Sequence, residues 1–229
     1  MGRPIHSLSI LTVTLTLTSL TLVSPPSQAA SFTNGSFEFG PEPGDFITLT
    51  TGSTAIPGWL VLGDSIDYGS YGSGWQASDG TRSLDLSGQG PGRIQQSFDT
   101  ILGATYQVLF DLAGNPAGDP VEKLLRVAAS GSTSQDYSFD TTGKTLTAMG
   151  WQTTAYNFTA TSPSTTLLFT SLTNSPFGPA LDNVRVSTGG GTPVTPVTPV
   201  PTPALLPGLI GMGVAAWRRR QAEARAAGE

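Results

Sequence analysis

YQVLFDL, residues 106–112, carries a large apolar side chain at every even-numbered position, with Gln107, Leu109 and Asp111 between them. A period of two is typical of a β-strand with one buried face, because successive side chains of a strand point to opposite sides. The same alternation recurs in residues 152–158 and 184–186. These three segments are therefore predicted to be strands.

Turn-forming residues separate the other apolar segments, as in GQGPG at 88–92 and GNP at 114–116. Further strands are predicted at residues 36–39, 46–50, 59–62, 65–68, 83–86, 93–98, 124–129, 136–139 and 165–172. Only residues 121–129 also suit a helix, and their glycine-rich surroundings argue against it. About a dozen short strands without a convincing helix predict an all-β fold, a two-sheet jelly-roll β-sandwich.

The composition excludes several kinds of chemistry. The 229 residues include no cysteine, so disulfides, thiolate zinc sites and cysteine nucleophiles are impossible. The single histidine is His6, which lies in a predicted signal peptide. The mature chain therefore has no imidazole for a Ser-His-Asp triad, for acid–base catalysis or for metal binding.

The charge of the central region is strongly negative. Residues 31–187 hold 14 acidic and six basic side chains. Such an excess repels the phosphates of nucleic acids and anionic lipids. Neutral sugars or divalent cations are better partners for this surface.

The N-terminus has the features of a secretory signal peptide. Arg3 precedes an uncharged apolar run at residues 8–23, which a Pro-Pro pair ends before Ser27-Gln28-Ala29. A basic start, an apolar centre and small residues at the cleavage site predict removal of residues 1–29 between Ala29 and Ala30. A retained N-terminal anchor is the alternative. We expect the ectodomain, residues 30–188, to be exported.

The C-terminal region reads as a stalk followed by a short apolar tail. Residues 189–203 combine glycines with a Thr-Pro-Val repeat, which favours a stiff polyproline II segment without a core. The apolar residues 204–217 would rise only about 21 Å as a helix, short of the roughly 30 Å of bilayer hydrocarbon. The arginines that follow would stay cytoplasmic. We expect a marginal membrane anchor within residues 204–229.

The order of elements in this tail resembles the PEP-CTERM class of bacterial sorting signals. The elements are a proline motif, a short apolar segment and an arginine cluster: Pro201, Thr202, Pro203, Ala204, then Arg218, Arg219 and Arg220. The resemblance implies processing by an exosortase-like enzyme, with the tail in the cytoplasmic membrane beforehand. Because the motif departs from Pro-Glu-Pro, the enzyme and the cleavage position stay open. A simple retained tail anchor is the alternative.

The central region resembles the bacterial choice-of-anchor C family, which is similar to a plant cell-wall domain family of unknown function with galactose-binding-like folds. The resemblance spans residues 32–186 and rests on ordered short motifs: NGSFE at 34–38, IPGW at 56–59, SIDY at 65–68, WQASDG at 75–80, SLDLSG at 83–88, DLAGNP at 111–116, MGW at 149–151 and GPALDNV at 178–184. It implies a cell-surface or extracellular-matrix protein with affinity for glycans, but no known ligand.

Asp182 is a candidate metal ligand. It shares strand parity with Val184 and Val186, so its carboxylate is expected to point toward a buried face, where it needs a partner. Glu38 lies at a comparable place near the first predicted strand. Galactose-binding-like modules often hold a structural calcium between such termini, and oxygen ligands suit calcium. The alternative is that Asp182 caps a bulge or pairs with Arg185 or Arg93.

Three aromatic residues are candidates for carbohydrate binding. Tyr68, Tyr71 and Trp75 lie in a segment rich in glycine and serine, where a core has little room for them. Sugar rings stack on exposed aromatic faces while polar groups fix the hydroxyls. The alternative for Trp75 is that it folds back over the sandwich. Trp59 and Trp151 lie in strand contexts and are expected in the core.

Together these features predict an exported, non-enzymatic protein of the cell surface or extracellular matrix that binds a polysaccharide. One alternative is a purely structural protein without a defined ligand. Another is a weak glycoside hydrolase, which would need two carboxylates facing across a cleft. Several acidic residues here, such as Asp79 and Asp119, lie in predicted turns instead.

Overall fold

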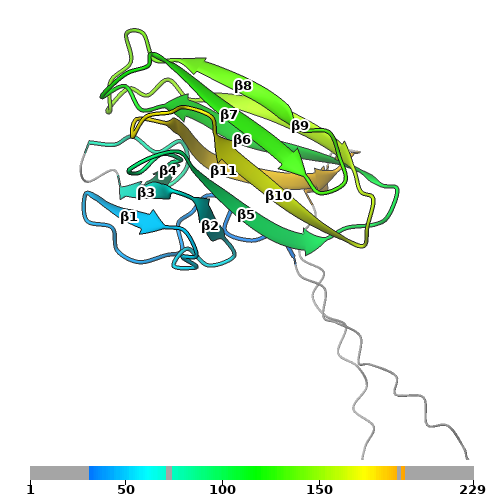
Figure 1. Ribbon diagram of the computed structural model, residues 1–229. Coiled ribbons are helices and arrows are strands. Elements are labelled where there is room, and N and C mark those ends of the chain that lie inside the picture. The colour runs from blue at the N-terminus through cyan, green and yellow to red at the C-terminus, as the bar shows by residue number, and fades with distance from the viewer. Residues whose placement is uncertain (1–30, 71–73, 190–191, 194–229) are drawn as a thin grey trace, which may run out of the picture.

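The computed structural model describes residues 31–70, 74–189 and 192–193 (Figure 1). These residues form two antiparallel β-sheets packed face to face, with no helix among them. The predicted two-sheet β-sandwich of the jelly-roll kind is thereby confirmed. The predicted signal peptide and the sorting motif at 201–204 with its arginines lie outside the described residues.

The first sheet contains the long central strands of the molecule. Its order is β1 (Phe46–Thr50), β3 (Ser65–Ser70), β4 (Arg82–Asp85), β11 (Pro179–Thr188), β6 (Thr105–Gly114) and β9 (Gln152–Thr159), with β12 (Thr192–Pro193) paired to the end of β11. The middle of this sheet joins strands far apart in the sequence, since β11 pairs with both β4 and β6.

The second sheet has five strands in the order β2 (Leu60–Gly63), β5 (Gly92–Asp99), β10 (Ser164–Ser171), β7 (Glu122–Ala129) and β8 (Gln135–Asp140). The segment that also suited a helix is strand β7. Its burial alternates residue by residue, which matches a strand with one face in the core. None of the described residues belongs to a helix of sufficient length and apolarity to span a bilayer.

The core lies between the sheets and is rich in aromatic rings. Phe110 of β6 packs edge-on against Phe169 of β10, with ring centroids 5.4 Å apart. Trp59 is buried beside Phe169, as predicted, and its indole Nε1 donates to the carbonyl of Asn34 at 2.9 Å. The N-terminal segment is thereby held against the sandwich, where Gly35 accepts a hydrogen bond from the backbone N–H of Val184.

A β-bulge in β11 changes which way Asp182 points. The register with β6 shifts between Asp182 and Arg185, and Asn183 adopts a left-handed φ of 50°. Because the bulge adds one residue, Asp182 lies on the same face as Asp111 of β6, opposite to Val184. Asp182 is fully buried as predicted, but the parity argument for its direction is wrong.

The connection between β3 and β4 explains the burial of Asp182. Residues 74–81 of this connection lie over the outer face of the first sheet. Ser78 Oγ donates to Asp111 Oδ2 at 2.5 Å. The backbone carbonyl of Gln76 accepts a hydrogen bond from Trp151 Nε1 at 3.0 Å. This 74–81 segment therefore covers the centre of the face and leaves its end beside β1 open.

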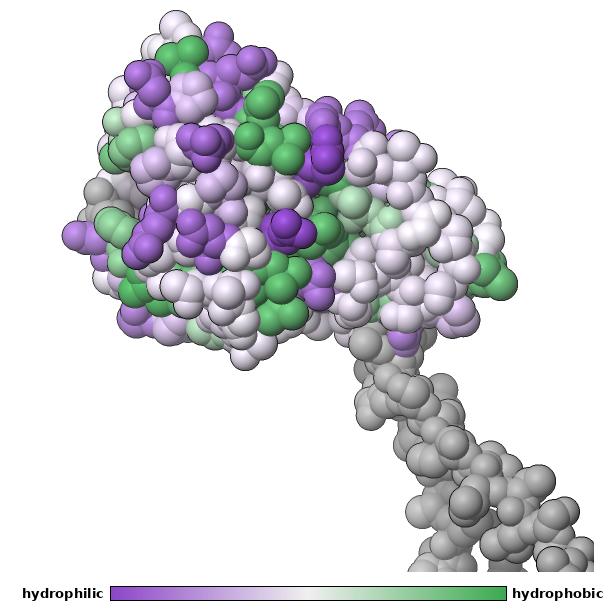
Figure 2. Space-filling view, in the orientation of Figure 1, coloured by the Kyte–Doolittle hydropathy of each residue, from purple (hydrophilic) through white to green (hydrophobic). Residues whose placement is uncertain are grey.

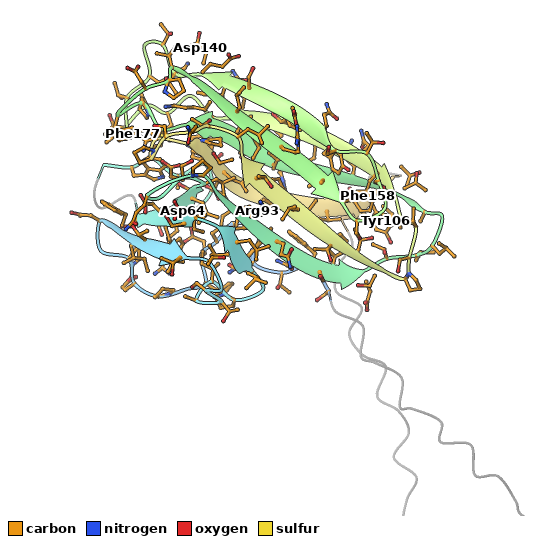
Figure 3. All side chains as sticks on the ribbon, viewed as in Figure 1. Asp64, Arg93, Tyr106, Asp140, Phe158 and Phe177 are labelled. Carbon is orange, nitrogen blue, oxygen red and sulfur yellow. The ribbon has the colours of Figure 1, made fainter. Side chains whose placement is uncertain are left out.

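Strand β6 runs along the length of the sandwich. At one end, the carbonyl of Thr105 accepts a hydrogen bond from the backbone N–H of Gly189, where the described chain leaves β11. At the other end, Gly114 leads into the loop that contains Asn115. In Figure 3, Tyr106 and Phe158 mark the first end and Phe177 the opposite one.

Candidate functional site

A cleft of about 410 Å³ opens on the outer face of the first sheet, at the end marked by Phe177. Strands β1, β3 and β4 form its floor, and the loops after β4, β6, β8 and β10 form its walls. Its lining consists of Asp45, Phe46, Asp67, Gly69, Trp75, Asp85, Gly88, Asn115, Ala117, Leu146, Pro176 and Phe177. Figure 2 shows that apolar residues on the visible face are scattered among hydrophilic ones.

Asp85 holds the walls of this cleft together. Its Oδ1 accepts hydrogen bonds from the backbone N–H groups of Ser87 at 2.8 Å and Gly178 at 3.0 Å. Its Oδ2 accepts one from Asn115 Nδ2 at 2.8 Å. One carboxylate at the end of β4 thereby fixes the loops after β4, β6 and β10.

Asp67 lies directly opposite Asp85 in the pairing of β3 with β4. Cross-strand partners have neighbouring side chains on one face, so the two carboxyls share the cleft floor. Burial raises the pKa of Asp85 to about 7, and the charge of Asp67 adds to this rise. Burial also raises the pKa of Asp67, although the hydroxyl of Thr48 donates to its Oδ1 at 2.6 Å.

The aromatic residues of the cleft differ in how they are held. Trp75 is half-buried: its indole Nε1 donates to Ser83 Oγ at 2.6 Å, and its ring covers Gly69. A Cβ at Gly69 would already lie 3.4 Å from Trp75 Cδ1, so the missing side chain makes room for the indole. Phe46 is 60% exposed at the start of β1. Trp75 therefore lies on the sheet and also lines the cleft.

Tyr68 does not belong to this surface, and its prediction as a sugar contact is wrong. It follows Ile66 on the inner face of β3 and is fully buried. Its hydroxyl donates to the carbonyl of Phe37 at 2.6 Å and accepts a hydrogen bond from Arg82 Nη1 at 3.0 Å. Tyr71 lies outside the described residues.

Glu38 and Asp182, the predicted calcium ligands, hold neighbouring parts of one segment. Glu38 Oε1 accepts hydrogen bonds from the backbone N–H groups of Thr81 and Arg82, at 2.9 and 2.8 Å. Asp182 Oδ2 accepts those of Ser78 and Asp79, at 2.8 and 2.9 Å. Burial raises the pKa of Asp182 to about 7. Both carboxylates thus anchor the β3–β4 connection, and Asp182 adjoins the bulge, as in the alternative considered for it.

A calcium ion at these oxygens would have to compete with the N–H donors that already face them. Within the described part of the chain, no group of three or more acidic side chains is arranged to hold a metal ion. Calcium at Glu38 and Asp182 stays a prediction.

The calcium hypothesis has a direct thermal test. Binding to the folded state alone stabilises it by about 2.7 kcal/mol when free ion exceeds Kd a hundredfold. If calcium binds here, a chelator lowers the melting temperature by several degrees, and Asp182→Asn removes that response. Differential scanning calorimetry with and without chelator measures this. If the chelator does not change the melting temperature, both carboxylates are hydrogen-bonded structural acids without calcium.

Sequence reasoning identified Trp75 but missed the other cleft residues, among them Phe46, Asp67, Asp85, Asn115 and Phe177. Part of the signal was present, since Asp67 follows Ile66 and Asp85 lies between two leucines. A carboxylate between buried apolar neighbours on a strand points to the opposite face. The pairing that sets the two carboxylates side by side is visible only in the folded sheet.

Comparison with known proteins gives a family and several distant relatives. A family model described as "Protein of unknown function (DUF642)" matches residues 30–187. Halomucin of Haloquadratum walsbyi is 33% identical over 164 residues, which is 69% of this chain but only 2% of halomucin.

Solved carbohydrate-binding modules are similar in structure at low sequence identity. TmCBM61, solved in complex with β-1,4-galactotriose, is 16% identical with a TM-score of 0.47, over 69% of this chain and 98% of that one. A family 35 module from Clostridium thermocellum is 13% identical with a TM-score of 0.41, over 61% of this chain and 97% of that one.

Proposed function

The chain belongs to the DUF642 family, whose function is unknown, and we propose from its cleft that it is a non-catalytic polysaccharide-binding protein. A single observation carries the proposal: an open cleft combines an exposed aromatic ring, Phe46, and the half-buried Trp75 with the carboxyl of Asp67. Sugar sites use this combination, in which apolar ring faces stack and polar groups fix the hydroxyls.

The arrangement of the acids argues for binding over hydrolysis. Glycoside hydrolysis needs one carboxyl to protonate the leaving oxygen and another to attack or activate water. Asp85 is nearly fully buried, and both of its oxygens accept N–H donors from the cleft walls. It organises the cleft and is poorly placed to reach a glycosidic oxygen.

The cellular setting belongs to the same proposal. The sequence features of the N-terminus support export, with cleavage between Ala29 and Ala30. Those of the C-terminus support anchoring and processing by an exosortase-like enzyme. The polysaccharide would then belong to the cell surface or the extracellular matrix.

The proposal is tested by screening the purified protein on an array of plant, algal and bacterial polysaccharides. Binding to at least one of them, competed by its soluble oligosaccharide, supports the proposal. Absence of binding to every polymer would favour a purely structural surface protein. Release of reducing sugar during the incubation would instead favour a hydrolase.

Phe46→Ala is expected to weaken binding to such a polymer about tenfold, because stacking of a ring on an aromatic side chain contributes about 1 to 3 kcal/mol. Its melting temperature should change little, since Phe46 is mostly exposed. Phe39→Ala is the matched control, because Phe39 is 71% exposed and does not line the cleft. Isothermal titration calorimetry compares the two. Equal effects of both variants would remove Phe46 from the site.

A further inference from the structure

We propose that the cleft accepts only glycans without acidic groups, which are polymers of neutral sugars or amino sugars, and that it rejects uronate-containing and sulfated polymers. This inference rests on the proposed function and specifies its ligand class. Its basis is the charge and the hydrogen-bonding inventory of the residues that line the cleft.

Every charged side chain that lines the cleft is acidic. Asp45, Asp67 and Asp85 contribute carboxyls, and no lysine or arginine lines it among the residues that the structure describes. A carboxylate or sulfate on a ligand would therefore approach like charges without a compensating cation. Like charges at such short range oppose each other strongly in a partly desolvated site.

Two basic residues near the cleft, Lys123 and Arg82, have other partners. Lys123 is fully buried behind the wall, and its Nζ donates to the carbonyls of Gly118 and Phe177 at 2.7 and 2.8 Å. Arg82 pairs with Glu42 and also donates to the carbonyl of Glu38. Neither cation faces the cleft, so neither can receive an anionic sugar without breaking these bonds.

Two side-chain donors of the lining already have partners within the protein, while an acceptor is open. Trp75 Nε1 donates to Ser83, and Asn115 Nδ2 donates to Asp85. Asp67 receives the hydroxyl of Thr48 at Oδ1, and its Oδ2 has no hydrogen bond from any described residue. A ligand must therefore supply donors to this position. Hydroxyl and ammonium groups can donate, whereas carboxylate and sulfate groups only accept.

The experiment compares matched polymers on the full-length protein. Galactan, mannan and hydroxyethyl cellulose are each paired with a derivative whose primary hydroxyls have been oxidised to carboxylates, and chitosan tests the amino-sugar branch. We expect at least one neutral polymer to bind and its oxidised form to bind at least tenfold more weakly by calorimetry. Tighter binding of chitosan than of every neutral polymer would assign the ligand to the amino sugars.

Two further measurements test whether the charge of the cleft causes the preference for neutral polymers. In Asp67→Asn the preference for the neutral polymer should shrink several-fold, whereas Asp99→Asn, a matched charge change at the exposed end of β5, should retain it. Raising the salt concentration should strengthen wild-type binding of the oxidised polymer, because salt screens repulsion, and leave neutral binding unchanged. The salt measurement needs no variant to fold.

The outcomes separate this inference from the function on which it rests. Equal or tighter binding of an oxidised polymer would overturn the ligand class while polysaccharide binding stood. Failure of all neutral, oxidised and amino polymers to bind would overturn the proposed function itself, and the ligand class with it.

Discussion

The free energy of unfolding is expected to fall as the pH rises from 5 to 8, by on the order of 2 kcal/mol for each of two buried carboxyls, Asp85 and Asp182. Burial raises the pKa of each to about 7 in the folded state. The unfolded chain has ordinary aspartate pKa values near 4. At a pH between these two pKa values, the folded protein holds protons that the unfolded chain has released. The free energy of unfolding therefore falls as the pH rises.

The groups around each carboxyl do not reverse this decrease of stability with rising pH. Asp85 is affected mainly by its own burial, with the neighbouring charge of Asp67 in the same direction. Asp182 is likewise affected mainly by burial, with the charge of Asp79 adding to it. The N–H donors to both carboxylates act in the opposite direction but do not outweigh burial.

Chemical denaturation at steps of half a pH unit from pH 5 to 8 measures how the free energy of unfolding changes with pH. Asp85→Asn and Asp182→Asn should each flatten this dependence, because neither amide titrates. Asp99→Asn removes an exposed carboxyl and should give a curve parallel to that of the wild type. A wild-type stability that rises over this range would show that hydrogen bonding outweighs burial at both sites.

Gly35→Ala should lower the free energy of unfolding by about 3 kcal/mol, the upper range for an overpacked site. A Cβ at Gly35 would overlap the backbone carbonyl oxygen of Val184. The two residues are already joined, since Val184 N donates to Gly35 O at 2.8 Å. Because both partners are backbone, neither can rotate away as a side chain would.

Gly143→Ala is the control for this substitution. Gly143 has a φ of 72° and nothing within 4 Å of an added Cβ, so its replacement brings backbone strain without a clash. Its expected cost is about 1 kcal/mol. Urea unfolding of both variants compares them directly. Equal losses of unfolding free energy in the two variants would mean that the N-terminal segment shifts to accommodate the added methyl group.

The alternation of apolar residues was sufficient to predict the sandwich, but local parity failed where the backbone is irregular. Asp182 shares parity with Val184 in the sequence, and the bulge at Asn183 reverses that relation. Tyr68 is the opposite case. Its parity with Ile66 correctly places it inside, but the glycines and serines that follow suggested a loop, whereas β3 continues to Ser70.

The cleft was less predictable because its residues come from segments far apart in the chain. Trp75 was recognised from its polar surroundings, and it does line the cleft. Asp85 and Asn115 become neighbours only because β11 lies between β4 and β6 and brings their loops together. No periodicity within one strand contains that information.

The lengthwise course of β6 and β11 has a mechanical consequence. Strand β11 ends at Thr188, where β12 pairs with it, and the cleft lies at the other end, beside Phe177 just before β11 begins. Ten residues of extended strand separate these ends by roughly 34 Å. A pull between a tether at Gly189 and a polymer held in the cleft would act along β11. Ladder hydrogen bonds run perpendicular to the strands, so such a force loads many of them together in shear. A force that peeled the strand from the sheet would instead break them one at a time.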